Sequence, residues 1–329
     1  MLYFISLGIL IVTGRNFYLG GSRIISLALQ IYLLLYGILW FFTIAELFFN
    51  KLTLVTMYLE IFKNRIRTIN SSSFLRFVLG AIISFQLAIT AYSNFKQNIW
   101  TYVENTHDKT LHRIDTGIHI GQRPLSELRC SKLLRKFALF IDNLYYFYFP
   151  NKIIMLAIFL FVSGYRSKQL QLFLLGQNLL WGIGVYLFLI YPALGPCYFQ
   201  PQIYYKSGTP MIIAYSLQNA LLRQHNVLYN FPDSFHPVPF LGISAMPSFH
   251  VAASFYYFLS SFWMRKWWIS VYCGLFFAGI FLGSIYTGWH YLLDGIAGMI
   301  WAGCIYLFMF LLRKKSLPVL SKYRKYYQC

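Results

Sequence analysis

Residues 244–312 read SAMPSFHVAASFYYFLSSFWMRKWWISVYCGLFFAGIFLGSIYTGWHYLLDGIAGMIWAGCIYLFMFLL and contain three long apolar runs. The runs are interrupted only by the basic pair Arg265-Lys266 and by a polar turn around His290. A bilayer core about 30 Å thick requires about 20 apolar residues for each spanning helix, and shorter spans occur. This stretch therefore predicts three consecutive membrane helices, at 248–263, 267–285 and 290–312.

The same pattern extends toward the N-terminus. Four further apolar runs predict spans at 24–49, 74–93, 150–164 and 169–191. Of the 329 residues, 58% are hydrophobic and 11% are charged, whereas an average soluble domain has about 25% charged residues. This balance excludes a disordered chain, a disulfide-stapled mini-protein and an ordinary soluble enzyme. The predicted fold class is all-α, a polytopic membrane helical bundle.

The spans divide the chain into three parts. We expect a hydrophobic helix and an interfacial segment over 1–73, a six-span core over 74–312, and a basic cytoplasmic tail over 313–329. Two long connections interrupt the core. Segment 94–149 contains an expected interfacial helix that stops near Gly121 and Pro124, and segment 192–247 is an outer loop whose Pro and aromatic content suggests an ordered lid.

Basic residues give the expected orientation. The chain has 28 Lys and Arg against 9 Asp and Glu, a net charge of +19. In a membrane protein this excess indicates cytoplasmic loops facing anionic lipid and gives no reason to expect nucleic acid as a partner. With the tail and the turn at Arg265-Lys266 in the cytoplasm, segment 192–247 lies outside. We expect a multi-pass protein of the cytoplasmic membrane.

Acidic residues are so few that Asp294 is conspicuous. It lies about one turn inside the last predicted span, four residues after His290, so both side chains share one helix face. Ionisable groups at such depth are candidates for function. A structural Asp that pairs with His290 or with a backbone donor is the alternative.

The second polar element is SAMPSFH at 244–250. Pro247 suits the first turn of a helix, and Ser244 or Ser248 suits a capping position. The N–H groups at such a helix start favour a bound anion. Because the helices alternate in direction, His250, His290 and Asp294 are predicted at the same membrane face. For His250 taken alone, a satisfied interfacial histidine is the alternative.

Two histidines and a carboxylate at an anion-friendly helix start suit phosphoryl transfer. One imidazole can attack phosphorus, the carboxylate can orient that ring, and the second histidine can protonate the leaving oxygen. Zinc is the rival interpretation of two His and one Asp. The setting at the mouth of membrane helices favours phosphate, so we expect neither a metal nor another cofactor.

These residues resemble a known family. PSFH at 247–250, followed by GWHYLLDGIAG at 288–298, resembles the second and third motifs of the type 2 phosphatidic acid phosphatase superfamily, and is most similar to the branch containing inositol phosphorylceramide synthases. The residues Asp108, Asp115, His119, Gly121 and Pro124 also resemble a segment of bacterial members. The resemblance implies a six-helix core, metal-independent chemistry and an extracytoplasmic site, with His290 as nucleophile, Asp294 as its partner and His250 as general acid.

The chain departs from the phosphatase pattern in its cations. No K-x6-RP motif follows the third core span, and Gly283 and Ser284 stand where the third motif has Ser-Arg. A phosphomonoester carries about two negative charges and a diester one, so a weaker cationic clamp favours a diester. The candidate substrate-binding residues are Ser248, Lys206, Arg223 and Ser284.

Three functions remain open at this stage. The first is a phosphotransferase that moves a phosphoinositol-like headgroup from a donor lipid to a lipid hydroxyl through a phosphohistidine. The second is a lipid phosphate or polyprenyl-diphosphate phosphatase with water as acceptor. The third is a lipid-binding or flipping protein that kept the fold and lost the chemistry, which the intact residues His250, His290 and Asp294 argue against. The expected partners are membrane lipids, as donor and acceptor.

Overall fold

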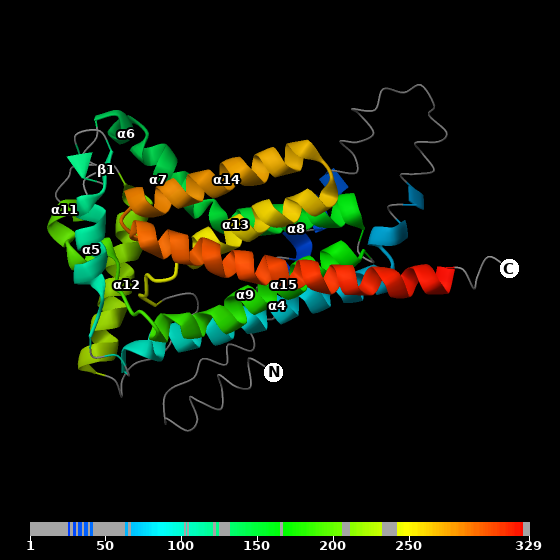
Figure 1. Cartoon of the computed structure of the whole chain (residues 1–329), viewed down its shortest axis with the longest axis horizontal. Helices are drawn as coiled ribbons and strands as arrows, with labels where there is room; N and C mark the ends of the chain where they lie inside the picture. The colour runs from blue at the N-terminus through cyan, green and yellow to red at the C-terminus, as the bar shows by residue number, and fades with distance from the viewer. Residues whose placement is uncertain are drawn as a thin grey trace.

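The protein is a bundle of helices that run side by side, with shorter helices across one end (Figure 1). The computed structural model describes residues 63–64, 67–101, 103, 105–120, 123–124, 132–164, 167–205, 211–231 and 242–324, together with isolated positions between 26 and 41. The predicted first span, 24–49, therefore lies largely outside the described residues.

The six-helix core consists of these elements: α4 (Ser72–Asn98), the pair α7 (Ala138–Tyr146) and α8 (Tyr148–Ser163), α9 (Lys168–Gly184), α13 (Phe249–Ser261), α14 (Trp267–Tyr286) and α15 (Leu292–Arg324). Among the described residues, four helical stretches are long and apolar enough to cross a membrane, and a fifth is present if the bent pair Ala138–Tyr146 and Asn151–Ser163 counts as one span. The chain is therefore an all-α, multi-pass membrane protein, as the apolar runs predict.

Local sequence explains where several core helices begin and end. Ser71 and Ser167 are the N-caps of α4 and α9, because their hydroxyls accept hydrogen bonds from Phe74 N and Leu170 N. Helix α8 ends before Gly164, whose φ of 74° favours glycine. Short 3-10 segments, Ile99–Thr101, Val185–Leu189 and Phe262–Met264, extend α4, α9 and α13.

Helix α13 is the central element of the bundle. It packs against α14 and α15 and also touches α9. Its 13 residues span about 20 Å, which is shorter than a bilayer core. Because neighbouring helices surround α13, its polar first turn lies against protein and not against lipid. This packing places the conspicuous His250 inside the molecule, at one end of the bundle.

That end of the bundle is covered by short elements (Figure 1). They are α5 (Asp108–Gly117), β1 (His119–Ile120), β2 (Arg123–Pro124), α6 (Lys132–Lys136), α10 (Pro196–Phe199), α11 (Pro201–Tyr205) and α12 (Ile212–Asn230). The two strands pair antiparallel. The interfacial helix predicted to stop near Gly121 ends already at Gly117, and the described part of segment 192–247 is mostly helical. Helices α5 and α12 therefore form much of the bundle end.

The predicted span 74–93 is five residues too short at its C-terminal end, because α4 continues to Asn98. The sequence SNFKQN looks like a polar exit from the membrane. In the structure Asn94 and Asn98 are buried, and their amides donate to the carbonyls of Thr90 and Asn94, each at 2.8 Å. Because these buried amides are hydrogen-bonded within the helix, α4 continues to the end of the bundle that the short elements cover. Lys96 therefore lies in the last turn of α4.

Candidate active site

His290 stands on the turn between α14 and α15. Gly288, with φ of 79°, makes this turn, and a side chain there would collide with Tyr204. The backbone N–H of His290 donates to the carbonyl of Ser284 at 3.2 Å. The imidazole is 7% exposed, and its Nδ1 lies 2.8 Å from the carbonyl oxygen of Ala245. A carbonyl only accepts, so Nδ1 carries the proton and Nε2 keeps its lone pair.

Asp294 is completely buried in the first turn of α15. Its Oδ2 accepts a hydrogen bond from Tyr291 N at 2.8 Å and lies 3.6 Å from Nδ1 of His290. The sequence suggested that this carboxylate orients the imidazole by a direct hydrogen bond. In the structure Ala245 performs that task, and Asp294 is a nearby charge at the start of the helix. Such a charge stabilises an imidazolium once one forms.

Two aspartates of α5 support the same turn. Asp115 accepts from Leu292 N at 3.3 Å, and Asp108 accepts from the hydroxyl of Tyr291 at 3.1 Å. Asp108 also accepts from Leu194 N and Gly195 N at 2.9 and 2.8 Å. Helix α5 thus binds the His290 turn to the segment that follows α9. Burial raises the pKa of Asp115 to about 7, against the effect of its bond to Leu292 N.

The start of α13 touches the start of α15. Ser248 is the N-cap of α13, and its N–H donates to the carbonyl of Asp294 at 2.9 Å. A Cβ added to Gly298 would lie 2.4 Å from the carbonyl oxygen of Ser248. Only glycine allows this approach. His250, in the first turn of α13, packs edge-on against Tyr148 with ring centroids 4.7 Å apart. The two motifs of the sequence are therefore in direct contact.

Both histidines line one cavity of about 80 Å³. Three further lining side chains place a buried polar atom there without a hydrogen-bond partner: Ser244 Oγ, Tyr146 Oη and Trp289 Nε1. The cavity wall consists of Tyr92, Lys96, Tyr145, Tyr146, Leu194, Tyr198, Leu217, Leu221, Gly242, Ile243, Ser244, Pro247, Phe249, His250, Trp289 and His290. Unpartnered donors in a cavity are suited to a ligand rich in oxygen.

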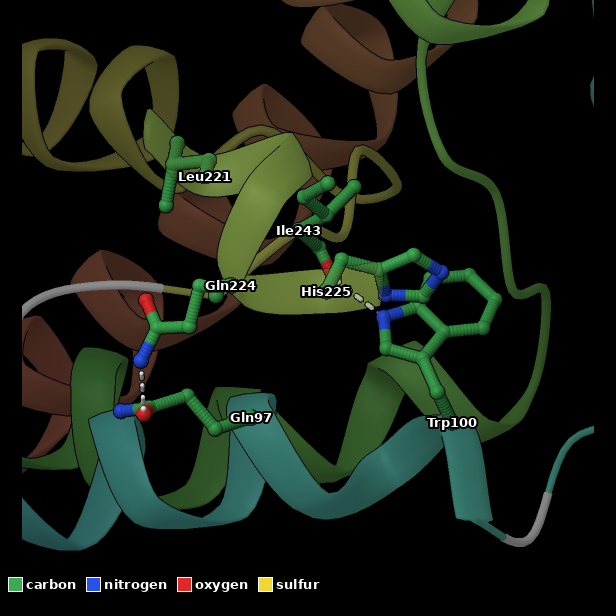
Figure 2. Close-up of a pocket in the computed structure, with 7 residues that line it drawn as sticks. Gln97, Trp100, Leu221, Gln224, His225 and Ile243 are labelled. Atoms are coloured by element: carbon green, nitrogen blue, oxygen red, sulfur yellow. Dashed lines mark hydrogen bonds between the residues drawn. The ribbon is translucent and has the colours of Figure 1, made fainter. Parts of the chain in front are cut away.

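A smaller hollow adjoins this cavity between the end of α4 and α12 (Figure 2). Two hydrogen bonds close it. Gln224 Nε2 donates to Gln97 Oε1 at 3.1 Å, and Trp100 Nε1 donates to the carbonyl of Ile243 at 2.6 Å (Figure 2). His225 packs edge-on against Trp100 with centroids 5.5 Å apart. The hydrogen bond between the side-chain amides of Gln224 and Gln97 thus joins α12 to α4 beside the cavity.

The structure brings only some of the predicted residues together. His250 and His290 line the cavity, and Asp294 lies behind His290. Ser248 is buried at the helix start, and its Oγ has no hydrogen-bond partner. Ser284 is buried within α14, where its hydroxyl donates to Phe281 O. Arg223 is on the exposed side of α12, and Lys206 lies outside the described residues.

The sequence analysis missed Lys96. This residue lies in the last turn of α4 and lines the cavity together with both histidines. Burial, together with the positive charge of Lys96, lowers the pKa of His290 to about 3. His290 is therefore neutral at physiological pH, as a nucleophile must be. A lysine at the outer end of a predicted span was the signal that could have identified it.

The fold and this cavity define a multi-pass helical membrane protein in which a buried histidine, His290, and a half-buried one, His250, line one cavity beside a carboxyl group. The family model of the PAP2 superfamily matches residues 109–308. The chain belongs to this superfamily, which comprises phosphatases and phosphotransferases. No curated protein and no solved structure matches the chain significantly.

Proposed function

We propose that the protein transfers a phospho-headgroup, of phosphoinositol type, from a phospholipid to a lipid hydroxyl through a phosphohistidine on His290. The reaction would take place at the extracytoplasmic face of the cytoplasmic membrane. The observation that carries the proposal is the joint position of His250 and His290 on one cavity, with Nδ1 of His290 held by the Ala245 carbonyl.

In the first step Nε2 of His290 attacks the phosphorus of the donor lipid. A P–N bond forms and the P–O bond to the diacylglycerol oxygen breaks. His250, which takes up a proton as the anionic donor binds, gives that proton to the oxygen. The charge that develops on the His290 ring lies 3.6 Å from Asp294, which stabilises it. The N-terminus of α13 offers its dipole to the negative phosphoryl group.

In the second step a lipid hydroxyl replaces diacylglycerol. His250, now neutral, takes the hydroxyl proton as the acceptor oxygen attacks phosphorus. The P–N bond breaks, His290 returns to its neutral state, and His250 is protonated for the next cycle. Atoms and protons therefore balance over the two steps, and no cofactor is required. The same steps with water as acceptor would describe the alternative, a lipid phosphate or polyprenyl-diphosphate phosphatase.

Product analysis tests this proposal. Purified protein in detergent is given phosphatidylinositol with a ceramide acceptor, or phosphatidic acid alone, and lipids and free phosphate are measured. Headgroup transfer without phosphate release supports the transferase. Release of phosphate from the monoester, with no transfer, overturns it in favour of the phosphatase.

Variants connect either activity with the site. His290→Ala removes the nucleophile and is expected to lower turnover by about 10⁴-fold or more. His119→Ala changes an exposed histidine outside the cavity and serves as the matched control. Full activity of folded His290→Ala protein would show that no phosphohistidine forms at this residue.

A further inference from the structure

Lys96 is a half-buried cation that faces the cavity. Its Nζ lies 5.4 Å from the ring centroid of Phe188 and 5.8 Å from that of Tyr92. The aliphatic part of the side chain lies beside Gly242, because a Cβ on that glycine would approach Lys96 Cγ to 3.3 Å. Aromatic rings and packed methylenes hold the side chain in place, with its ammonium at the cavity.

Within the described part of the chain, Lys96 forms no ion pair. The buried aspartates at this end of the bundle bind backbone N–H groups instead. Asp108 accepts from Leu194 N and Gly195 N, and Asp142 accepts from Ile213 N and Ala214 N. At the His290 turn, Asp115 accepts from Leu292 N and Asp294 from Tyr291 N. An ammonium taken partly out of water without an anion is costly. The missing anion is therefore expected to be a ligand of the cavity.

Lys96 also lies outside the segment that defines the family, because the matched residues begin at 109. The sequence lacks the expected clamp of one Lys and two Arg within that segment. Lys96 is the one Lys or Arg among the described residues that line the cavity. It belongs to α4, which precedes the matched segment in the sequence, and not to the helices that carry the two histidines.

We infer that Lys96, together with the hydroxyl of Ser244, binds the non-bridging oxygens of the substrate phosphoryl group and selects a singly charged phosphodiester. This inference rests on the proposed phosphoryl-transfer function. Ser244 is 5% exposed, lines the cavity, and has an Oγ without a hydrogen-bond partner. One ammonium balances the single negative charge of a diester, whereas a monoester carries nearly two. A monoester would leave about one charge unbalanced in a cavity with little water.

Charge-changing variants of Lys96 test the inference by kinetics. Lys96→Met and Lys96→Gln are expected to raise KM for phosphatidylinositol by about 10- to 100-fold, the range for losing a hydrogen bond to a charged group. Lys96→Arg keeps the charge and is expected to stay much closer to the wild type. Lys109→Met, an exposed lysine on α5 at the same bundle end, is the matched control. Equal KM values for Lys96→Gln and wild type would overturn the inference.

Selectivity provides the second kinetic readout. The wild type is expected to prefer the diester phosphatidylinositol over the monoester phosphatidic acid, and Lys96→Gln is expected to reduce that preference. Ser244→Ala should raise KM by a smaller factor than Lys96→Gln. If Lys96→Met fails to fold, the comparison of Lys96→Arg with Lys96→Gln still isolates the charge. A wild type that prefers the monoester would overturn the assignment of selectivity.

A binding measurement separates this inference from the proposed function. Titration of the His290→Ala protein with inorganic phosphate, followed by tryptophan fluorescence because Trp289 lines the cavity, needs no turnover. Saturable binding that Lys96→Gln abolishes in the same background supports the inference, even if the wild type transfers no headgroup. If the wild type is active but Lys96→Gln leaves phosphate binding unchanged, the proposed function stands and the inferred role of Lys96 is overturned.

Discussion

The two helices that carry the site begin in opposite ways. At the start of α15, Tyr291 N and Leu292 N donate to the carboxylates of Asp294 and Asp115 at 2.8 and 3.3 Å. At the start of α13, Ser248 occupies the N-cap position but makes no side-chain capping bond. One helix start is therefore already covered by the protein's own carboxylates, and the other leaves its positive end for a ligand. The contrast supports the proposal that the start of α13 binds the anion.

Among variants of the two helix starts, the largest effect is expected from Asp294→Asn. The amide oxygen can still accept from Tyr291 N, but the charge 3.6 Å from His290 is lost. We expect turnover to fall by about 100-fold or more, with a melting temperature close to that of the wild type. Steady-state kinetics and a thermal melt in detergent measure both. Unchanged turnover would mean that Asp294 serves only as a cap of α15.

Ser248→Asp would make the start of α13 resemble that of α15. A carboxylate at this position caps the helix but repels a phosphoryl group, so we expect turnover to fall by about tenfold or more. Ser248→Asn is the control, because asparagine also suits the N-cap and has nearly the size of aspartate without its charge. If the aspartate variant were as active as the asparagine variant, the start of α13 would not be the anion site.

Gly298→Ala tests the contact between the two helix starts. The added methyl would meet the carbonyl oxygen of Ser248 at 2.4 Å, so α13 must shift away from α15. We expect a loss of about 1–3 kcal/mol in unfolding free energy and several-fold lower turnover. Gly303→Ala, where nothing lies within 4 Å, is the matched control on the same helix. Equal stability of the two variants would contradict the close approach.

The last prediction concerns Asp115 and the pH dependence of stability. Its pKa is raised from 3.8 to about 7 by burial, so between these values the folded state binds more protons than the unfolded state. Stability contributed by the protonated carboxyl is complete below about pH 4 and decreases as pH rises toward 7. Asp115→Asn is expected to flatten this decrease in melts recorded at pH 5 and pH 7.5. Parallel pH curves for the two proteins would contradict the shift.

The sequence predicted the membrane bundle and both histidine motifs because each depends on a local pattern. Apolar runs define spans, and Pro247 and Ser248 mark the start of α13. It missed the distant partners. The bond from His290 to Ala245 joins residues 45 positions apart, and nothing in the sequence indicates which carbonyl accepts. Asp142 was also overlooked, although a carboxylate in the apolar stretch FALFIDNLYYF was a visible signal.

The span ends were the least predictable part of the fold. Polar residues after Thr90 indicated an exit from the membrane, yet Asn94 and Asn98 are buried by neighbouring elements and stay in α4. That error of five residues removed Lys96 from the list of candidates. Arg223 and Lys206 were chosen because they are bases of the outer loop. The exposure of Arg223 depends on how α12 folds onto the bundle, and a hydropathy pattern does not contain this information.

Helix α12 is joined to the rest of the protein by hydrogen bonds at three places along its length. Asp142 holds its first turn, Gln218 donates to the Thr287 carbonyl at 2.9 Å, and Gln224 donates to Gln97. Between these ties Leu217 and Leu221 turn toward the cavity. If the proposed phosphohistidine forms, these apolar side chains would control how long the P–N bond survives before water reaches it. The choice between a lipid hydroxyl and water as the acceptor would then depend on the hydrogen bonds that hold α12 over the cavity, and not on the histidines.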